Sequence, residues 1–150
     1  MLSAQVKKSI DECVLCWLAT TNKDYQPNVS PKEVFTYWLD QHIIIANIAS
    51  RKSALNIREN ALVCISFIDV LVQKGFKAKG MAVVLDEEKS AYQEMKCVLE
   101  KMTNGKYPFR EIIAVEIKYV EPIIAPSYRF FPEMKAQEII DRAKKKYRLN

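Results

Sequence analysis

The stretch from residue 42 to residue 59 constrains the fold more than any other part of the chain. Residues 43–46 are apolar and mostly β-branched, as in a buried strand over residues 42–47, and residues 53–59 are typical of a short helix. Between them lie Ser50, Arg51, Lys52 and Ser53. A helix start leaves backbone N–H groups without partners and carries partial positive charge, so two cations and two hydroxyls there suit a phosphate. The alternative is an ordinary N-cap at Ser50 or Ser53, with the basic side chains in water.

The hydrophobic periodicity of the remaining chain predicts strands with helices inserted between them. We expect helices over residues 6–12, 53–59 and 89–103 and from Glu133 onward, and strands over residues 13–21, 26–36, 42–47, 61–69, 72–86 and 111–120. Pro31 lies in the middle of the second strand, which favours an edge position or a bulge. In the last strand, Ile113, Val115, Ile117 and Tyr119 are expected to face one way. About six strands with helical insertions predict a mainly β, α+β fold: an antiparallel barrel forming a single domain over residues 1–150.

Composition narrows the class of protein. Hydrophobic residues make up 49% of the chain and charged residues 27%, as in a globular protein. Only three glycines are present, so neither a Walker loop nor a Gly-x-Gly-x-x-Gly turn can be written. The N-terminus has no apolar signal segment, and the longest apolar run (residues 14–19) is too short for a membrane span, so we expect a cytoplasmic protein that contacts no membrane.

The four cysteines lie in apolar segments, so we expect buried, reduced thiols. Cys13 and Cys16 fall on an expected strand, where an offset of three directs the side chains to opposite faces. This arrangement predicts no redox pair and no metal site. His42, the only histidine, is expected to be exposed at a strand end.

The net charge of +5 raises the question of nucleic-acid binding. The excess lies in Lys74, Lys77 and Lys79 on an expected strand and in residues 144–148 on the polar face of the terminal helix. A surface for nucleic acid would interleave aromatic side chains with the cations, and only Phe76 lies among the strand lysines. The pattern therefore disfavours a nucleic-acid partner, although a basic nucleic-acid-binding β-barrel is kept as an alternative.

Several motifs occur in a fixed order. Residues 27–32 read Pro-Asn-Val-Ser-Pro-Lys, residues 47–52 read Asn-Ile-Ala-Ser-Arg-Lys, and an apolar strand follows after Asn60. A Lys-Ala-Lys-Gly segment then occupies residues 77–80. Together these motifs resemble the pyridoxamine 5′-phosphate oxidase-like flavoproteins over roughly residues 13–85. The resemblance implies an antiparallel, six-stranded split β-barrel of Greek-key type that binds FMN.

The resemblance also implies roles for individual residues. Arg51 and Lys52 would hold the FMN phosphate, assisted by Ser50, Ser53 and Asn56, of which Ser53 and Asn56 have a capping role as the alternative. The strand formed by Asn28, Val29, Ser30, Pro31 and Lys32 would lie against the flavin ring, and Asn47 would contribute its backbone or amide. Lys32 would favour the anionic reduced flavin; the alternative is a solvated charge on an edge strand. No catalytic residue is assigned, because hydride chemistry belongs to the flavin.

The sequence departs from that of the true oxidases in ways that bear on the substrate. Asn28 replaces an arginine, Ala61 replaces a proline, Gly75 stands in place of a glutamine, and the arginine-rich C-terminal segment has no counterpart. These departures argue against pyridoxamine phosphate oxidation rather than against FMN binding. We therefore expect an FMN-dependent oxidoreductase acting on a small redox substrate or NAD(P)H. A non-catalytic flavin carrier or sensor, and a haem- or deazaflavin-binding relative, are the alternatives.

The resemblance further implies a symmetric homodimer with FMN at the subunit interface. A flat ring needs two walls, and one barrel of this size offers one. The second wall would come from the partner subunit, with residues 128–131 or the terminal helix as candidates.

Overall fold

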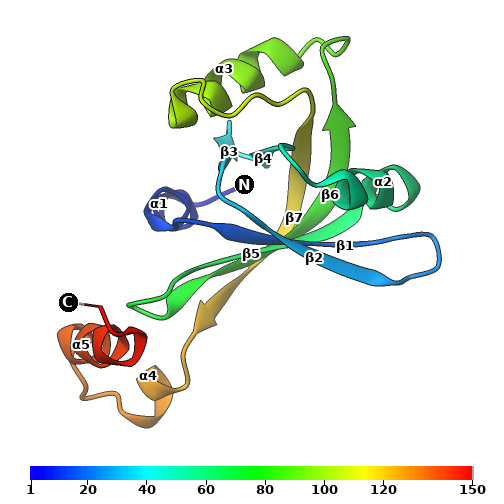
Figure 1. Ribbon diagram of the computed structural model, residues 1–150. Coiled ribbons are helices and arrows are strands. Elements are labelled where there is room, and N and C mark those ends of the chain that lie inside the picture. The colour runs from blue at the N-terminus through cyan, green and yellow to red at the C-terminus, as the bar shows by residue number, and fades with distance from the viewer. Residues whose placement is uncertain (150) are drawn as a thin grey trace.

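A computed structural model describes residues 1–149, in which one curled sheet is surrounded by helices (Figure 1). The strands are β1 (Cys16–Thr21), β2 (Pro27–Lys32), β3 (Phe35–Trp38), β4 (His42–Ala46), β5 (Leu62–Asp69), β6 (Lys74–Leu85) and β7 (Ile112–Ile124). The helices are α1 (Ala4–Glu12), α2 (Arg51–Glu59), α3 (Tyr92–Thr103), α4 (Ser127–Phe130) and α5 (Ala136–Tyr147).

The seven strands form one antiparallel sheet in the order β2-β1-β5-β6-β7-β4-β3. The curled sheet with its helices confirms the predicted antiparallel split barrel. The inner face carries alternate residues of each strand, including Leu18, Ile65 and Val115, which are fully buried. Helix α1 adds Val6 and Ile10 to this core.

The apolar run in β4 is explained by burial on both faces of that strand. Ile43 and Ile45 belong to the barrel core, whereas Ile44 belongs to a second cluster that includes Met95 and Leu99 of α3. A strand covered on both faces shows continuous rather than alternating hydrophobicity. Packing on both sides therefore holds the end of β4, and with it the start of the following α2, in place.

The strand predicted over residues 26–36 is two strands, which raises the count from six to seven. β2 and β3 lie at opposite edges of the sheet and are separated only by Glu33 and Val34. The edge position expected for Pro31 is confirmed, because β2 pairs only with β1. The predicted strand end at residue 36 is also too early, since Tyr37 and Trp38 still pair with β4. The residues of β2 and β3 alternate as if they formed one strand, so hydrophobic periodicity does not show that the chain passes from one edge of the sheet to the other.

The expected facing of β7 is wrong beyond its first half because of a β-bulge. Lys79 pairs with Tyr119 and Gly80 pairs with Ile117, so Lys118 is an extra residue. One extra residue reverses which side chains face the core. Tyr119, expected on the same face as Val115, is consequently 72% exposed on the outer face.

The cysteines are only partly as predicted. All four are free, but Cys97 is exposed and only Cys16 is fully buried. Cys13 is the C-cap of α1 and not part of a strand, so the pair straddles a helix end and a strand start. Within residues 1–149 no helix combines the length and hydrophobicity that crossing a membrane would require.

The bulge leaves no room for a side chain at Gly80. A Cβ atom at this position would lie 2.0 Å from the carbonyl oxygen of Glu116, a backbone atom that cannot move aside. We expect Gly80→Ala to lower the free energy of unfolding by about 2 kcal/mol, measured by urea denaturation. Gly105→Asn is the control, because Gly105 has a φ of +69° with nothing within 4 Å and Asn tolerates that conformation. Equal midpoints for the two variants would contradict this account of the bulge.

Candidate functional site

Helix α2 starts at Arg51, two residues earlier than predicted, so Arg51 and Lys52 lie in its first turn. Ser50 occupies the N-cap position, but its side chain makes no capping hydrogen bond. Its hydroxyl accepts a hydrogen bond from the Lys32 amine instead. Within residues 1–149, no side chain accepts from the first-turn N–H groups of residues 51–53, so these donors remain available.

The alternation of β2 decides which of its residues face this helix. Asn28, Ser30 and Lys32 lie opposite Thr20, Leu18 and Cys16 of β1 and therefore share the inner face. Val29 and Pro31 project to the outer face. The structure thus brings three of the five predicted β2 side chains to the start of α2 and directs the other two away from it.

A polar cluster ties β2 and β1 to α2. The Ser53 hydroxyl lies 3.1 Å from the Ser30 hydroxyl and accepts from the Asn28 amide at 3.3 Å. The Asn28 and Asn56 amides both donate to the Thr20 hydroxyl, at 3.2 and 3.1 Å. Ser53, Asn56 and Thr20 are buried, so these bonds are shielded from water. Ser53 and Asn56 therefore connect helix to sheet, and neither caps the helix.

Lys32 is buried, with 6% of its surface exposed, so its interpretation as a solvated edge-strand charge is wrong. Burial lowers the pKa of the Lys32 amine, opposed only by the nearby Cys16 thiol. Burial likewise raises the pKa of Cys16 to about 12, which keeps that thiol neutral. No carboxylate within residues 1–149 pairs with Lys32. The amine is a buried cation whose hydrogen bond goes to a neutral hydroxyl.

Arg51 and Lys52 are exposed, and neither forms an ion pair within residues 1–149. Arg58, about two turns further along the same helix, forms an ion pair with Glu111. Glu111 also accepts from the Asn47 side-chain amide at 2.8 Å, while the Asn47 side-chain oxygen Oδ1 accepts from the Ser50 backbone N–H at 3.3 Å. Asn47 therefore shapes the turn before α2, and the charges of Arg51, Lys52 and Lys32 remain without a counter-ion.

Two hollows flank this turn. One, of about 270 Å³, is lined by residues 31–34, Ala46, Ile48, Ala49, Ser50 and Tyr107. The other, of about 410 Å³, is lined by residues 47–51, Ala54, Leu55, Arg58 and Glu111. The first hollow is bordered by β2 and the second by the first turn of α2.

The sequence analysis did not single out Tyr107 or Thr20. No local pattern marks Tyr107, and Thr20 is identified only by its register opposite Asn28.

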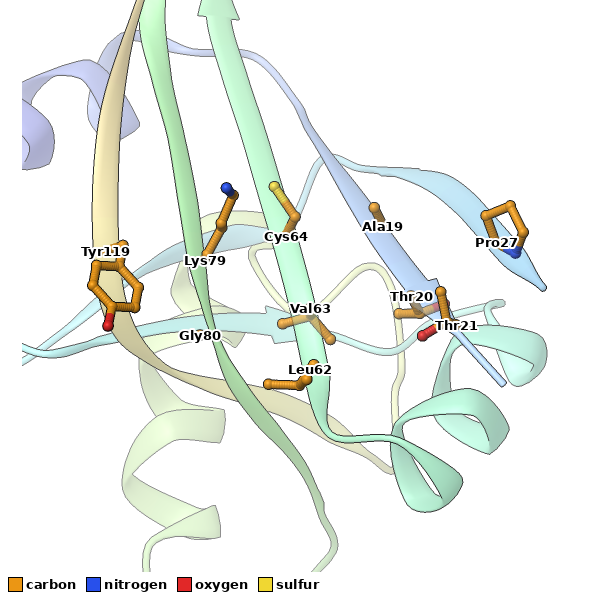
Figure 2. Close-up of a pocket in the computed structure, with 10 residues that line it drawn as sticks. All are labelled: Ala19, Thr20, Thr21, Pro27, Leu62, Val63, Cys64, Lys79, Gly80 and Tyr119. Atoms are coloured by element: carbon orange, nitrogen blue, oxygen red, sulfur yellow. The ribbon is translucent and has the colours of Figure 1, made fainter. Parts of the chain in front are cut away.

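A third hollow lies on the outer face of the sheet (Figure 2). It measures about 470 Å³ and is mainly apolar. Ala19, Cys64, Lys79 and Tyr119 form one row across β1, β5, β6 and β7. Thr20 borders this hollow next to Ala19, but its hydroxyl belongs to the polar cluster, so the hollow and the cluster lie on opposite faces of β1.

His42 is half-buried, not exposed as expected, and its Nδ1 atom is buried without a hydrogen-bond partner. It begins β4, whereas the turn before α2 follows the end of that strand. Five residues of strand separate His42 from Asn47 by about 16 Å. His42 therefore lies outside the site at the start of α2.

Comparison with known proteins agrees with this architecture. The sequence model of the family described as pyridoxamine 5′-phosphate oxidase matches residues 2–123. No curated protein sequence matches the chain.

Known structures share the fold at low sequence identity. HupZ from Group A Streptococcus is similar with a TM-score of 0.69 and 23% identity, covering 80% of this chain and 92% of that one. An FMN-binding protein from Syntrophomonas wolfei has a TM-score of 0.67 and 18% identity, covering 80% and 84%. HutZ, the heme storage protein from Vibrio cholerae, has a TM-score of 0.62 and 17% identity, covering 82% and 94%. At these identities the likeness establishes the fold, and the cofactor has to be argued from the site.

The buried amine of Lys32 gives a prediction with a defined pH dependence. Its folded-state pKa lies below the ordinary 10.5, so between these values the unfolded chain binds more protons and stability rises with pH. At pH values below the folded-state pKa, the cost of burying the charged amine lowers the stability of the fold by its full amount. We therefore expect Lys32→Met to be more stable than wild type by about 1 kcal/mol at neutral pH, with the difference narrowing as pH approaches 10.5.

The measurement is urea denaturation of the two proteins across this pH range. Lys101→Met is the control, because Lys101 is exposed on α3 and its substitution should not change the pH profile. A Lys32→Met variant that is less stable than wild type throughout would show that the amine is favourably solvated in the fold.

Proposed function

Because the chain belongs to the pyridoxamine 5′-phosphate oxidase family, we propose that it binds FMN at the start of α2. The observation that carries the proposal is the group of cations without counter-ions, Lys32, Arg51 and Lys52, beside uncapped helix N–H groups. A dianionic phosphate supplies the missing negative charge and the missing acceptors together.

Arg51 and Lys52 hold the phosphate in this proposal. The guanidinium offers a two-pronged contact and the ammonium a compact charge, while the N–H groups of the first turn add directed donors. Ser50 lies beside them and links the phosphate to Lys32. Asn47, Ser53 and Asn56 act indirectly, because their hydrogen bonds fix the turn and the helix against the sheet.

The flavin ring would lie along the edge strand formed by residues 28–32. β2 pairs on one side only, so its other edge is open to hydrogen-bond the polar edge of the ring. Asn28, Ser30 and Lys32 line the inner face, and Pro31 and Lys32 border the hollow next to the turn. Val29 and Pro31 contribute through their backbone and through the outer surface.

Bound FMN supplies hydride or electron transfer, so the protein needs no acid or base of its own. The buried positive charge of Lys32 favours a cofactor that gains negative charge on reduction. This supports an oxidoreductase acting on NAD(P)H or a small redox substrate, and a flavin carrier without turnover is the alternative. No residue is assigned a catalytic role.

Haem is the second candidate, because HutZ shares the fold and is a heme storage protein. Histidine is the commonest protein ligand of haem iron in globin-type sites, and His42 is the only histidine of the chain. It lies about 16 Å along β4 from the turn before α2. A haem at that turn would therefore need a different axial ligand, and FMN is the better fit.

The outer face is the proposed interface of a homodimer. Trp17, Leu62, Met81, Val83 and Tyr119 all expose large apolar side chains. Contiguous exposed apolar surface marks an interaction site, and a self-complementary sheet face suits a two-fold contact. Because the open edge of β2 borders this face, a flavin along that edge would adjoin the second subunit.

An absorbance spectrum of the purified protein tests the proposal as a whole. A flavin spectrum whose chromophore is released as FMN supports it, and bleaching by NADH or NADPH without oxygen indicates a reductase half-reaction. A Soret band supports the haem alternative. A colourless protein that does not bind added FMN would refute the proposal.

Removing both phosphate-binding cations should weaken FMN binding strongly. Each charge-assisted hydrogen bond is worth about 1.5–3 kcal/mol, so we expect Arg51→Ala with Lys52→Ala to raise the Kd for FMN at least about 100-fold. Titration by quenching of flavin fluorescence measures this. Lys101→Ala with Lys106→Ala removes the same charge from exposed positions elsewhere and should leave the Kd unchanged. A Kd equal to that of wild type in the first variant would refute the phosphate assignment.

Placing a charge on the outer face should dissociate the dimer. Leu62 is 65% exposed in the single chain, so Leu62→Glu costs little stability in a monomer but buries a carboxylate in an interface. We expect sedimentation velocity to show a dimer for wild type and a monomer for Leu62→Glu, together with weaker FMN retention. Met102→Glu, at an exposed position on α3, should remain dimeric. A monomeric wild-type protein, or a dimeric Leu62→Glu variant, would contradict this interface.

A further inference from the structure

Residues 124–149 form an arm that extends beyond the family match, which ends at residue 123. The arm contains the last residue of β7, the short helix α4 and the helix α5. In Figure 1 both helices lie beyond the end of β7, at the end of the molecule opposite α3. None of the side chains that the proposed function uses for FMN or for the outer-face interface belongs to this arm. The surface of the arm is therefore not explained by the proposed function.

The arm carries most of the chain's excess positive charge. Residues 124–149 contain seven of the 23 lysines and arginines but only three of the 18 acidic residues, which gives the arm +4 of the net charge of +5. All ion pairs within residues 1–149 lie between residues 7 and 121, so none of these seven cations is paired there. The arm therefore presents unneutralised positive charge to a negatively charged partner.

Exposed apolar side chains lie in the same part of the molecule. Phe130 is 73% exposed, Phe131 is 50% exposed, and Ile124 at the end of β7 is 56% exposed. Phe130 and Ile124 line a hollow of about 570 Å³ together with the cations Lys74 and Arg129. Apolar and cationic groups therefore share one surface near α4.

α4 is anchored, so this exposure is a property of the fold. The Tyr128 hydroxyl donates to the backbone carbonyl of Val72 at 2.7 Å, and the Lys74 amine lies 3.9 Å from the centre of the Tyr128 ring. Both contacts join α4 to the start of β6. Phe130 remains exposed although it follows the anchoring residue by only two positions.

Helix α5 adds a basic face. Its apolar side is already used within the fold, because Ile139 and Ala143 are buried. Lys145 and Lys146 lie three and four residues after Arg142, so these three exposed cations share one side of the helix. α5 therefore contributes positive charge, and the region around α4 contributes apolar side chains.

Apolar side chains beside unpaired cations suit the surface of an anionic membrane, where cations meet headgroups and apolar side chains reach the acyl chains. Single-stranded nucleic acid would also attract the cations, but it binds by stacking successive bases on aromatic rings. Phe130 and Phe131 are consecutive and Ile124 has no ring, which favours lipid over stacked bases. The expectation that the protein contacts no membrane rested on the lack of a signal segment and of a spanning segment, and a surface contact needs neither.

We propose that the arm docks the protein on the surface of a membrane that contains anionic lipids. The cations of α5 and Arg129 contact the lipid headgroups, and Phe130 and Phe131 enter the boundary between headgroups and acyl chains. The charge of the arm complements that of the membrane, and the position of the arm at one end of the molecule leaves a flat surface room to approach. The docking does not depend on FMN, so it can be tested whether or not the protein binds a flavin.

Flotation of the full-length protein with lipid vesicles tests the proposal. Vesicles of phosphatidylcholine alone are compared with vesicles in which phosphatidylglycerol replaces part of the phosphatidylcholine. We expect binding to the anionic vesicles only. Binding should weaken at least about 10-fold in about 0.5 M NaCl, where the screening length falls to about 4 Å. Binding to neither kind of vesicle, or equal binding to both, would overturn the proposal.

The charge variant combines Arg142→Gln, Lys145→Gln and Lys146→Gln. Each cation beside an anionic leaflet strengthens binding by about fivefold, so we expect the partition coefficient to fall about 100-fold. The control removes the same charge from three exposed positions outside the arm, with Lys89→Gln, Lys101→Gln and Lys106→Gln. It should bind like wild type. An equal loss in the control would show that net charge alone attracts the protein, and would overturn the assignment to the arm.

The apolar variant combines Phe130→Ser and Phe131→Ser. Both rings are at least half exposed, so the variant should keep the thermal midpoint of wild type, measured by circular dichroism. We expect its partition coefficient for anionic vesicles to fall at least about 10-fold. The control, Val14→Ser with Met102→Ser, removes exposed apolar side chains outside the arm and should bind normally. Undiminished binding of the apolar variant would overturn the proposal.

Two other roles of the arm give different results. Loss of binding to a single-stranded oligothymidine in the charge variant, with its vesicle binding intact, would assign the arm to nucleic acid. Loss of dimerisation in the apolar variant, with its vesicle binding intact, would assign the arm to a subunit contact. Fluorescence anisotropy and sedimentation velocity measure these two outcomes, and either would overturn the proposal.

Discussion

The contact between the inner face of β2 and the first turn of α2 is the interaction on which the proposed site depends. Ser30 and Asn28 meet Ser53, and the buried amine of Lys32 donates to Ser50. These bonds occupy the side chains that would otherwise cap the helix. The first turn is left with free N–H donors and with two cations that find no acid within residues 1–149. A helix start that is not satisfied within its own fold is prepared for an anion from outside.

The same contact places the proposed site at an edge of the sheet. β2 pairs only with β1, so its open side can accept a ligand that hydrogen-bonds along the strand. This open edge borders both faces of the sheet, and one barrel provides only one wall for a flat ring.

The elements with strong local signals could be predicted from the sequence, and so could the cations at the turn. The apolar run of β4 and the Ser-Arg-Lys-Ser tetrad predicted the strand-to-helix junction that the structure shows between β4 and α2, where the proposed site lies. Three features escaped because they depend on tertiary pairing. The division of one expected strand into β2 and β3 has no periodic signature, and the bulge at Lys118 reverses the facing of Tyr119 only through its partner strand. The burial of Lys32 required knowing that its strand register faces the inner side. Ser53 and Asn56 proved to connect the helix to the sheet.

The most direct test of the central claim is a crystal structure of the protein grown with a stoichiometric excess of FMN. The account predicts phosphate density at the first turn of α2, in contact with Arg51 and Lys52, and the ring along β2. Well-ordered FMN bound elsewhere, with no anion at that turn, would contradict it.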